Sequence, residues 1–218
     1  EDPGIKKSWE AYKENAPAFL TISGIYVLVG LIEVAISLII YFVILSFTDA
    51  GEATSSISRL TSRVITFPLS FVSQLSFAML TVIAALYYQK GEKITISETF
   101  NHLFKRPFRY ILAGIFYTLS LVLGILFCII PGIIILFITP IYINKIFTTD
   151  LGIIEAFGNS FQSLFRSGKW LSFCFISLLA GLLTWVVTIC TCFIGGFVAV
   201  PMCALYIQNL CYSKGILN

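Results

Sequence analysis

Long apolar runs separated by short polar segments dominate this sequence. Between Leu123 and Trp170, one apolar run ends at Pro131-Gly132 and a second begins at once and continues to about Phe147. A polar turn at 148–150 then leads into a segment that is apolar on one helical face only. Because a spanning helix needs ~20 mostly apolar residues, this pattern predicts two membrane spans followed by a helix lying on the membrane surface.

The same pattern along the whole chain predicts an all-α polytopic membrane protein. We expect six transmembrane helices arranged as three hairpins, each preceded by a short cytoplasmic amphipathic interfacial helix. The expected spans are 17–47, 64–88, 108–130, 133–147, 170–187 and 193–210. Polar residues 48–63 are expected to form the longest extramembrane loop.

Local signals predict where the amphipathic helices begin and which faces they bury. Thr95 and Glu98 fit a capping box, and Asp150 is expected to cap the following helix. The apolar face of the first helix is expected to comprise Ile5, Trp9, Tyr12 and Ala16, and that of the third Ile154, Phe157, Phe161 and Leu164. Six aromatic residues are candidates for interfacial or partner-docking contacts: Trp9, Tyr12, Phe100, Phe104, Phe157 and Phe161.

An approximate internal repeat divides the single membrane domain, 1–218, into 1–88, 89–148 and 149–218. Pro140 and Pro201 lie 61 residues apart, and so do the similar triplets that begin at Leu103 and Leu164. Lysine and arginine are distributed unevenly, with only Arg59 and Arg63 on one expected side and the other twelve opposite. The positive-inside rule therefore predicts that both termini are cytoplasmic.

Composition supports a membrane protein and narrows its partners. The chain is 58% hydrophobic and 11% charged, whereas a soluble domain carries about 25% charged residues. A net charge of +3 with scattered basic residues predicts no nucleic-acid partner. The expected partners are membrane lipids and other integral membrane proteins, and the expected location is the bacterial inner membrane.

No catalytic or cofactor-binding motif can be assembled from the sequence. It lacks a Walker loop, an H-E-x-x-H motif and a Ser-His-Asp set, and His102 is its one histidine. Six cysteines lie in or beside apolar runs and are expected to be packing residues and mostly free thiols. A metal site would need Cys128, Cys190 and Cys192 together. We therefore expect a non-enzymatic protein without cofactor or metal.

Glu33 is the one ionisable residue deep in an expected span. A carboxylate there costs about 2.5–3.5 kcal/mol even on insertion scales, so it should be paired, protonated or facing a polar cavity. Its helix carries small and polar residues at helical spacing, and Gln74 on the second span is the expected hydrogen-bond partner of Glu33. The candidate intramembrane polar site comprises Glu33, Gln74, Ser23, Tyr26 and Ser37. A packing role and a proton or ligand site both remain open.

The apolar residues around Pro131-Gly132 and the segment Ile154-Glu155-Ala156-Phe157-x-x-Ser160 resemble a group of bacterial integral membrane proteins. The group includes the membrane domain of some glycerophosphodiester phosphodiesterases and the YciC-like proteins. The resemblance covers about 95–210 and implies a six-helix membrane module, mostly of unassigned function. It implies no catalytic residue, and the helix after Pro131-Gly132 lacks the arginine that members often carry.

Two functions from different classes fit the sequence. We favour a non-enzymatic inner-membrane structural or accessory subunit of a larger membrane protein assembly. The alternative is a small transporter or lipid-handling permease that uses the polar stripe around Glu33.

Overall fold

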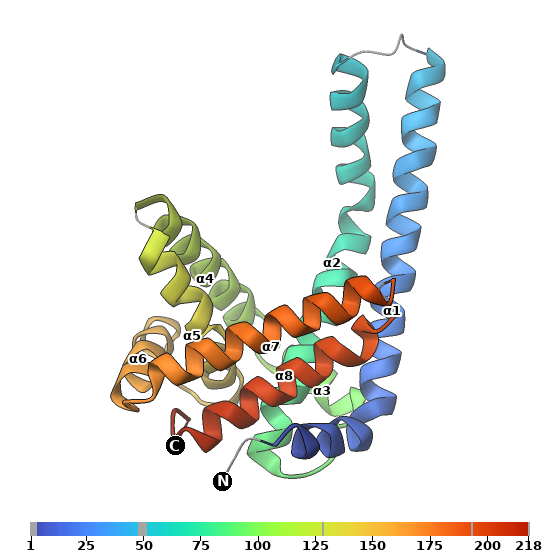
Figure 1. Ribbon diagram of the computed structural model, residues 1–218. Coiled ribbons are helices and arrows are strands. Elements are labelled where there is room, and N and C mark those ends of the chain that lie inside the picture. The colour runs from blue at the N-terminus through green and yellow to red at the C-terminus, as the bar shows by residue number, and fades with distance from the viewer. Residues whose placement is uncertain (1–3, 48–51, 128, 193, 218) are drawn as a thin grey trace. The chain divides into compact units, whose positions relative to one another are not determined.

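A computed structural model describes residues 4–47, 52–127, 129–192 and 194–217, which form eight α-helices and no strand (Figure 1). In chain order the helices are α1 (Ile5–Phe47), α2 (Glu52–Lys90), α3 (Ile96–Lys105), α4 (Pro107–Phe127), α5 (Ile129–Thr148), α6 (Ile153–Arg166), α7 (Trp170–Cys190) and α8 (Gly196–Ser213). The predicted all-helical class is therefore confirmed.

Five of the described helices, α1, α2, α4, α5 and α7, are long and apolar enough to cross a membrane. Among them α1 has the most apolar 18-residue window, with a mean hydropathy of 2.7. The 18 residues of α8 include the adjacent polar side chains Gln208 and Asn209, and α8 is not among the five. The described chain is thus a membrane-embedded helical protein with five clear candidate spans.

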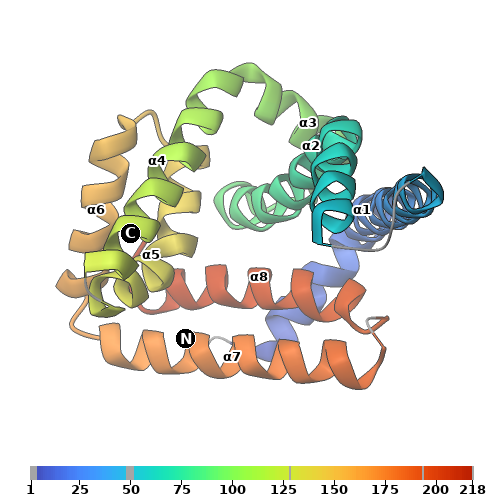
Figure 2. The same ribbon diagram turned by 90° about the horizontal axis from the view of Figure 1, so that it is seen from above.

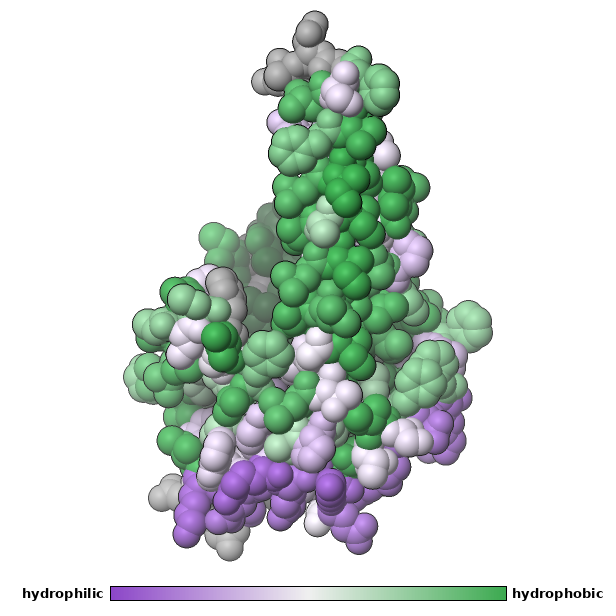
Figure 3. Space-filling model, turned by 90° about the vertical axis from the view of Figure 1, so that its right-hand side faces the viewer, coloured by the Kyte–Doolittle hydropathy of each residue, from purple (hydrophilic) through white to green (hydrophobic). Residues whose placement is uncertain are grey.

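The chain forms two compact units. Unit 1 comprises Glu1–Phe19 and Thr81–Asn218, and unit 2 comprises Leu20–Leu80. Within unit 2, α1 and α2 run side by side in opposite directions (Figures 1 and 2). The face of unit 2 that is turned to the viewer in Figure 3 is mainly hydrophobic, as expected for helices that face lipid or other spanning helices.

The start of α2 differs from the prediction. The residues from Glu52 to Arg63 are helical, although 48–63 was expected to be a loop; 48–51 lie outside the described residues. The Arg59 guanidinium donates to the Ser55 carbonyl at 3.2 Å and to the Ser55 hydroxyl at 3.1 Å. Helix-forming Glu, Ala, Leu and Arg lie between the polar Ser and Thr residues, so the segment extends the helix instead of ending it.

In the N-terminal part of α1, two residues of the predicted apolar face are exposed and two polar residues are buried within the chain. Ile5 is 66% exposed and Trp9 is 41% exposed, whereas Ser8 and Asn15 are fully buried. The Asn15 side chain donates to the Ala11 carbonyl at 2.9 Å and accepts from the Ile94 backbone N–H at 2.8 Å. Hydrogen bonding thus makes a polar residue part of the core, which the apolar pattern alone did not indicate.

Helix α5 is the central helix of unit 1 and contacts α4, α6 and α8. Ile138 and Ile141 join a core with buried side chains of α6, α7 and α8. Tyr142 and Ile146 form a second cluster with Ala113 of α4 and Ala156 of α6. Helix α5 therefore packs against four helices, α4, α6, α7 and α8, through two separate clusters of side chains.

The α4–α5 hairpin is tight because two glycines meet across it. Pro131 and Gly132 lie in the first turn of α5 and not between the helices, so the predicted helix boundary was a few residues late. Pro is tolerated there because the first-turn N–H groups have no helical acceptor. A Cβ on Gly132 would lie 3.1 Å from the Ile125 backbone nitrogen, and one on Gly124 would lie 3.2 Å from Gly132 Cα. Only glycine allows this backbone approach.

Of the two predicted helix caps, that of α3 forms and that of α6 does not. The capping box of α3 is confirmed: Glu98 N–H donates to Thr95 Oγ1 at 3.2 Å, and Thr95 N–H donates to Glu98 Oε2 at 2.8 Å. Asp150 does not cap α6, whose N-cap is Gly152. The Asp150 carboxylate instead accepts from the Arg106 guanidinium, a partner distant in sequence.

Candidate functional site

Glu33 is the acidic residue in the middle of the apolar part of α1, and it is half-buried in unit 2. Its Oε1 atom is buried and has no hydrogen-bond partner. Among the described residues, no ion pair to Glu33 is formed. Because an ionisable group at membrane depth normally pairs or faces a polar cavity, this carboxyl group is incompletely satisfied within the chain.

The hydrogen bond predicted between Glu33 and Gln74 is absent among the described residues. Gln74 lies on an exposed position of α2. The remaining members of the predicted polar site are also divided: Ser23 is 7% exposed and Ser37 is half-buried, while Tyr26 is 44% exposed. Helical spacing alone therefore did not indicate which of these residues are buried, on α1 or on α2.

The buried face of α2 in unit 2 is a row of hydroxyl residues that the sequence analysis missed: Ser58, Ser62, Thr66, Ser73 and Ser76. Their spacing of three, four and seven residues was a usable signal for one helical face. Thr66 donates to the Ser62 carbonyl at 2.8 Å, and Ser76 donates to the Val72 carbonyl at 2.9 Å. These two hydroxyl hydrogens are used within their own helix and are not available to Glu33.

Unit 1 contains a buried amide pair between α5 and α8. Asn144 Nδ2 donates to Gln208 Oε1 at 3.0 Å, and Gln208 Nε2 donates to the Pro140 carbonyl at 2.9 Å. Asn144 is 3% exposed and Gln208 is 4% exposed. Sequence analysis did not single out this pair, although an Asn and a Gln within apolar runs were a signal for buried polar contacts.

A second polar contact in unit 1 replaces the helical hydrogen bond that Pro140 cannot make. Proline has no N–H, so the Leu136 carbonyl has no helical donor four residues later. The Thr139 hydroxyl donates to that carbonyl at 2.7 Å, and Tyr117 OH lies 2.5 Å from Thr139 Oγ1. Since the Thr139 hydrogen is used, Tyr117 is the donor in this pair, and α4 is thereby tied to α5.

The C-terminal end of α5 is capped by three side chains from elsewhere in unit 1. His102 Nε2 donates to the Phe147 carbonyl at 2.8 Å, and Gln89 donates to the Thr148 carbonyl at 3.3 Å. Arg109 donates to the Thr149 and Leu151 carbonyls at 2.7 and 2.8 Å. These donors satisfy carbonyls that a helix end leaves unpaired. The small polar cavity of about 170 Å³ beside them is part of this structural junction.

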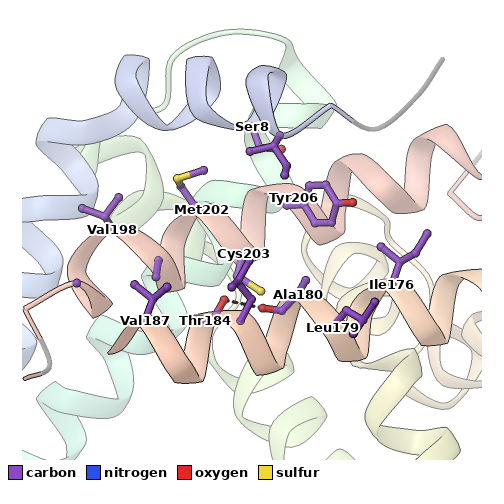
Figure 4. Close-up of a pocket in the computed structure, with 14 residues that line it drawn as sticks. Ser8, Ile176, Leu179, Ala180, Thr184, Val187, Val198, Met202, Cys203 and Tyr206 are labelled. Atoms are coloured by element: carbon purple, nitrogen blue, oxygen red, sulfur yellow. Dashed lines mark hydrogen bonds between the residues drawn. The ribbon is translucent and has the colours of Figure 1, made fainter. Parts of the chain in front are cut away.

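A larger cavity of about 630 Å³ lies between α7 and α8 and is crossed by the first turns of α1 (Figure 4). Its walls are mainly apolar, and four of the lining residues, Ser8, Thr184, Cys203 and Tyr206, carry a side-chain oxygen or sulfur. The Thr184 hydroxyl donates to the Ala180 carbonyl at 2.8 Å (Figure 4). Its hydrogen is therefore satisfied by the helix, and this wall behaves as an apolar surface.

The predicted interfacial aromatics fall into two groups. Trp9, Phe100 and Phe104 are exposed, at 41%, 44% and 50%. Tyr12 is 5% exposed, and Phe157 and Phe161 pack against the core cluster of α5 to α8. Only the first group is placed for contacts outside the chain.

The described residues contain no group of three or more His, Cys, Asp or Glu side chains that could hold a metal ion. Cys174, Cys190, Cys192, Cys203 and Cys211 are free thiols. Cys128 lies outside the described residues, so the predicted three-cysteine site cannot be built from this structure.

The chain matches no protein-family model, no curated protein and no solved structure. Its function is therefore argued from its own residues alone.

Proposed function

We propose that this protein is a non-enzymatic structural or accessory subunit of a larger membrane protein assembly. The observation that carries the proposal is the buried, unpartnered Oε1 of Glu33 in the most apolar span. Because Glu33 as a whole is only half-buried, its carboxyl group would pair with a lysine, arginine or amide side chain on a spanning helix of another protein. The exposed apolar surface of the α1 span, of which only 6% is buried in its most apolar window, provides the surrounding contact area.

The finer topology is part of the same proposal. We infer that α8 is a sixth span, because its Gln208 amide is hydrogen-bonded to α5 and Asn209 is buried, so neither amide needs contact with lipid. Helices α3 and α6 would then be cytoplasmic interfacial helices of an inner-membrane protein whose termini are both cytoplasmic. The shared order of a short helix followed by two longer ones, α3–α4–α5 and α6–α7–α8, supports the internal repeat and the resemblance to YciC-like membrane modules.

Mild-detergent purification from the native membrane tests the proposed function. The wild-type chain should retain a stoichiometric membrane protein, and Glu33→Leu should lose it. Glu33→Gln separates two kinds of contact, since an amide keeps a hydrogen bond but not an ion pair. Leu38→Ala, at a 52% exposed position of the same helix, is the control. Retention of the partner by Glu33→Leu would contradict the proposal.

The transporter alternative predicts a different result for the same variants. An uptake or efflux defect in Glu33→Gln, in a chain that purifies without a partner, would favour it. Neither cavity described above is lined by Glu33, so the accessory role remains the better supported proposal.

A further inference from the structure

We propose that the cavity between α7 and α8 binds one acyl chain of a membrane glycerophospholipid. Its volume of about 630 Å³ falls within the ~300–1,000 Å³ typical of small-molecule sites. One wall belongs to α7, a candidate membrane span, so the medium around the cavity is hydrocarbon. This site is in unit 1 and does not depend on the partner proposed for Glu33.

The length of the cavity fits one acyl chain. Its lining runs from Ile176 to Val187 on α7 and from Gly195 to Tyr206 on α8. Each wall is eleven residue steps long, or about 17 Å at 1.5 Å per residue. The hydrocarbon core of a bilayer is ~30 Å thick, so one leaflet is about half of that thickness. The walls therefore match the depth that a single acyl chain occupies.

Ser8 supplies a polar contact where α1 crosses the cavity (Figure 4). Its side chain lines the cavity and is fully buried, and its hydroxyl lies against the Tyr88 side chain. The ester carbonyl of a phospholipid is an acceptor, and from this side of the cavity it would take the Ser8 hydroxyl hydrogen in place of Tyr88. The exposed Lys6 lies two residues before Ser8 on α1 and provides positive charge for the headgroup phosphate.

A photoreactive phospholipid tests the site in the intact protein. The chain is reconstituted in nanodiscs with phosphatidylglycerol that carries a diazirine near the end of one acyl chain. We expect cross-links on peptides containing Ile176–Val187 or Val198–Tyr206. Labelling confined to other apolar surfaces would overturn the proposal. If a diazirine fatty acid labels the cavity more strongly than the phospholipid does, the assignment to a phospholipid is overturned. If a polypeptide is cross-linked in the cavity, the occupant is a protein and the proposal is overturned as well.

Neighbouring residues of α8 provide a matched pair of variants. Ala199 lines the cavity, whereas Val200 does not and is 38% exposed. Ala199→Trp should abolish the labelling and remove the lipid seen bound by native mass spectrometry, and Val200→Trp should retain both. Ala180→Trp fills the opposite wall and serves if Ala199→Trp does not fold. Normal lipid retention in a folded filling variant would contradict the proposal.

Ser8→Ala measures the polar contact separately from the apolar one. Loss of one neutral hydrogen bond should weaken lipid retention roughly twofold to tenfold without changing which peptides are labelled. Unchanged retention would show that Ser8 does not contact the lipid ester and would overturn that part of the proposal.

Discussion

The two units differ in the hydrogen bonding of polar side chains within their apolar helices. In unit 1, Asn144 and Gln208 are hydrogen-bonded to each other, and Tyr117 is bonded to Thr139. In unit 2, Oε1 of Glu33 is buried without a partner. Unit 1 also has buried polar atoms without a hydrogen bond, Ser177 Oγ and Asn209 Nδ2 among them, but these belong to hydroxyl and amide groups and not to a carboxyl group. The difference indicates that unit 1 uses its polar groups to hold its own helices, whereas Glu33 is suited to a contact beyond the chain.

The glycines of the α4–α5 hairpin differ in the same way from those of α1. A Cβ on Gly132 would lie 2.5 Å from a side-chain atom of Ile125, whereas one on Gly24 or Gly30 of α1 would meet nothing within 4 Å. The glycines of the α4–α5 hairpin are thus already used for close packing within the chain. Those of α1 remain on open surface, where another helix could approach.

Replacement of Arg109 should give the largest effect on stability. Its side chain is 17% exposed and donates to two carbonyls between α5 and α6. Arg109→Leu leaves both unpaired and should lower the free energy of unfolding by about 2–4 kcal/mol, measured by denaturant titration in detergent.

Arg106→Leu is the control for this experiment. Arg106 pairs with Asp150 at the surface, where the two side chains are 46% and 85% exposed, so its loss should cost less than about 1 kcal/mol. Equal losses for the two arginines would show that the carbonyl contacts of Arg109 do not stabilise unit 1.

Alanine substitutions at two glycines sharpen the contrast in helix packing. Gly132→Ala should destabilise the chain by about 1–3 kcal/mol because the α4–α5 backbones must move apart. Gly30→Ala should leave the chain unchanged or slightly more stable, since alanine favours the helix. Thermal unfolding of both variants in one detergent provides the measurement, and a larger loss for Gly30→Ala would contradict the described packing.

The amide pair tests whether unit 1 depends on its internal hydrogen bonds. Gln208→Leu leaves the Asn144 amide and the Pro140 carbonyl without this partner and should cost about 1–2 kcal/mol. The double variant with Asn144→Leu should cost less than the sum of the two single changes, because both polar groups are then removed. Additive losses would mean that the two amides do not interact.

The pH dependence of unfolding that arises from Glu98 in α3 should be the smallest of these predicted effects. Hydrogen bonds from the Thr95 backbone and hydroxyl, followed by the charge of Lys90, lower the pKa of Glu98 from 4.5 to about 2. Because the folded-state pKa is depressed, this contribution is present above pH 4.5 and is lost as the pH falls towards 2. Glu98→Gln should therefore reduce the pH dependence of unfolding in that window. An unchanged pH profile would contradict a stabilising role for the ionised capping box.

Sequence reasoning succeeded where the interacting residues are close along the chain. Thr95 and Glu98 are three residues apart, and the capping box forms as predicted. Asp150 was misassigned because its partner, Arg106, is 44 residues away. The Asn144–Gln208 pair is separated by 64 residues, and no local pattern indicates which two helices will meet.

The buried faces of the long helices were harder to predict for a related reason. In a membrane, apolar residues are favourable on every side of a helix, so hydrophobicity does not mark the inner face. Gln74 was therefore placed on the inner side of α2, although the buried row runs through Ser73 and Ser76. The predicted loop ending at Arg63 failed because helical hydrogen bonding continues through polar residues outside a hydrophobic run.

The central claim, that Glu33 serves a contact outside the chain, is tested most directly by measuring two properties of Glu33→Leu and Gln208→Leu side by side. The properties are the free energy of unfolding of the purified chain and the amount of partner retained from the native membrane. We expect Gln208→Leu to lower the unfolding free energy, and Glu33→Leu to leave it unchanged or raise it while abolishing partner retention. Destabilisation of the isolated chain by Glu33→Leu with the partner retained would contradict the account.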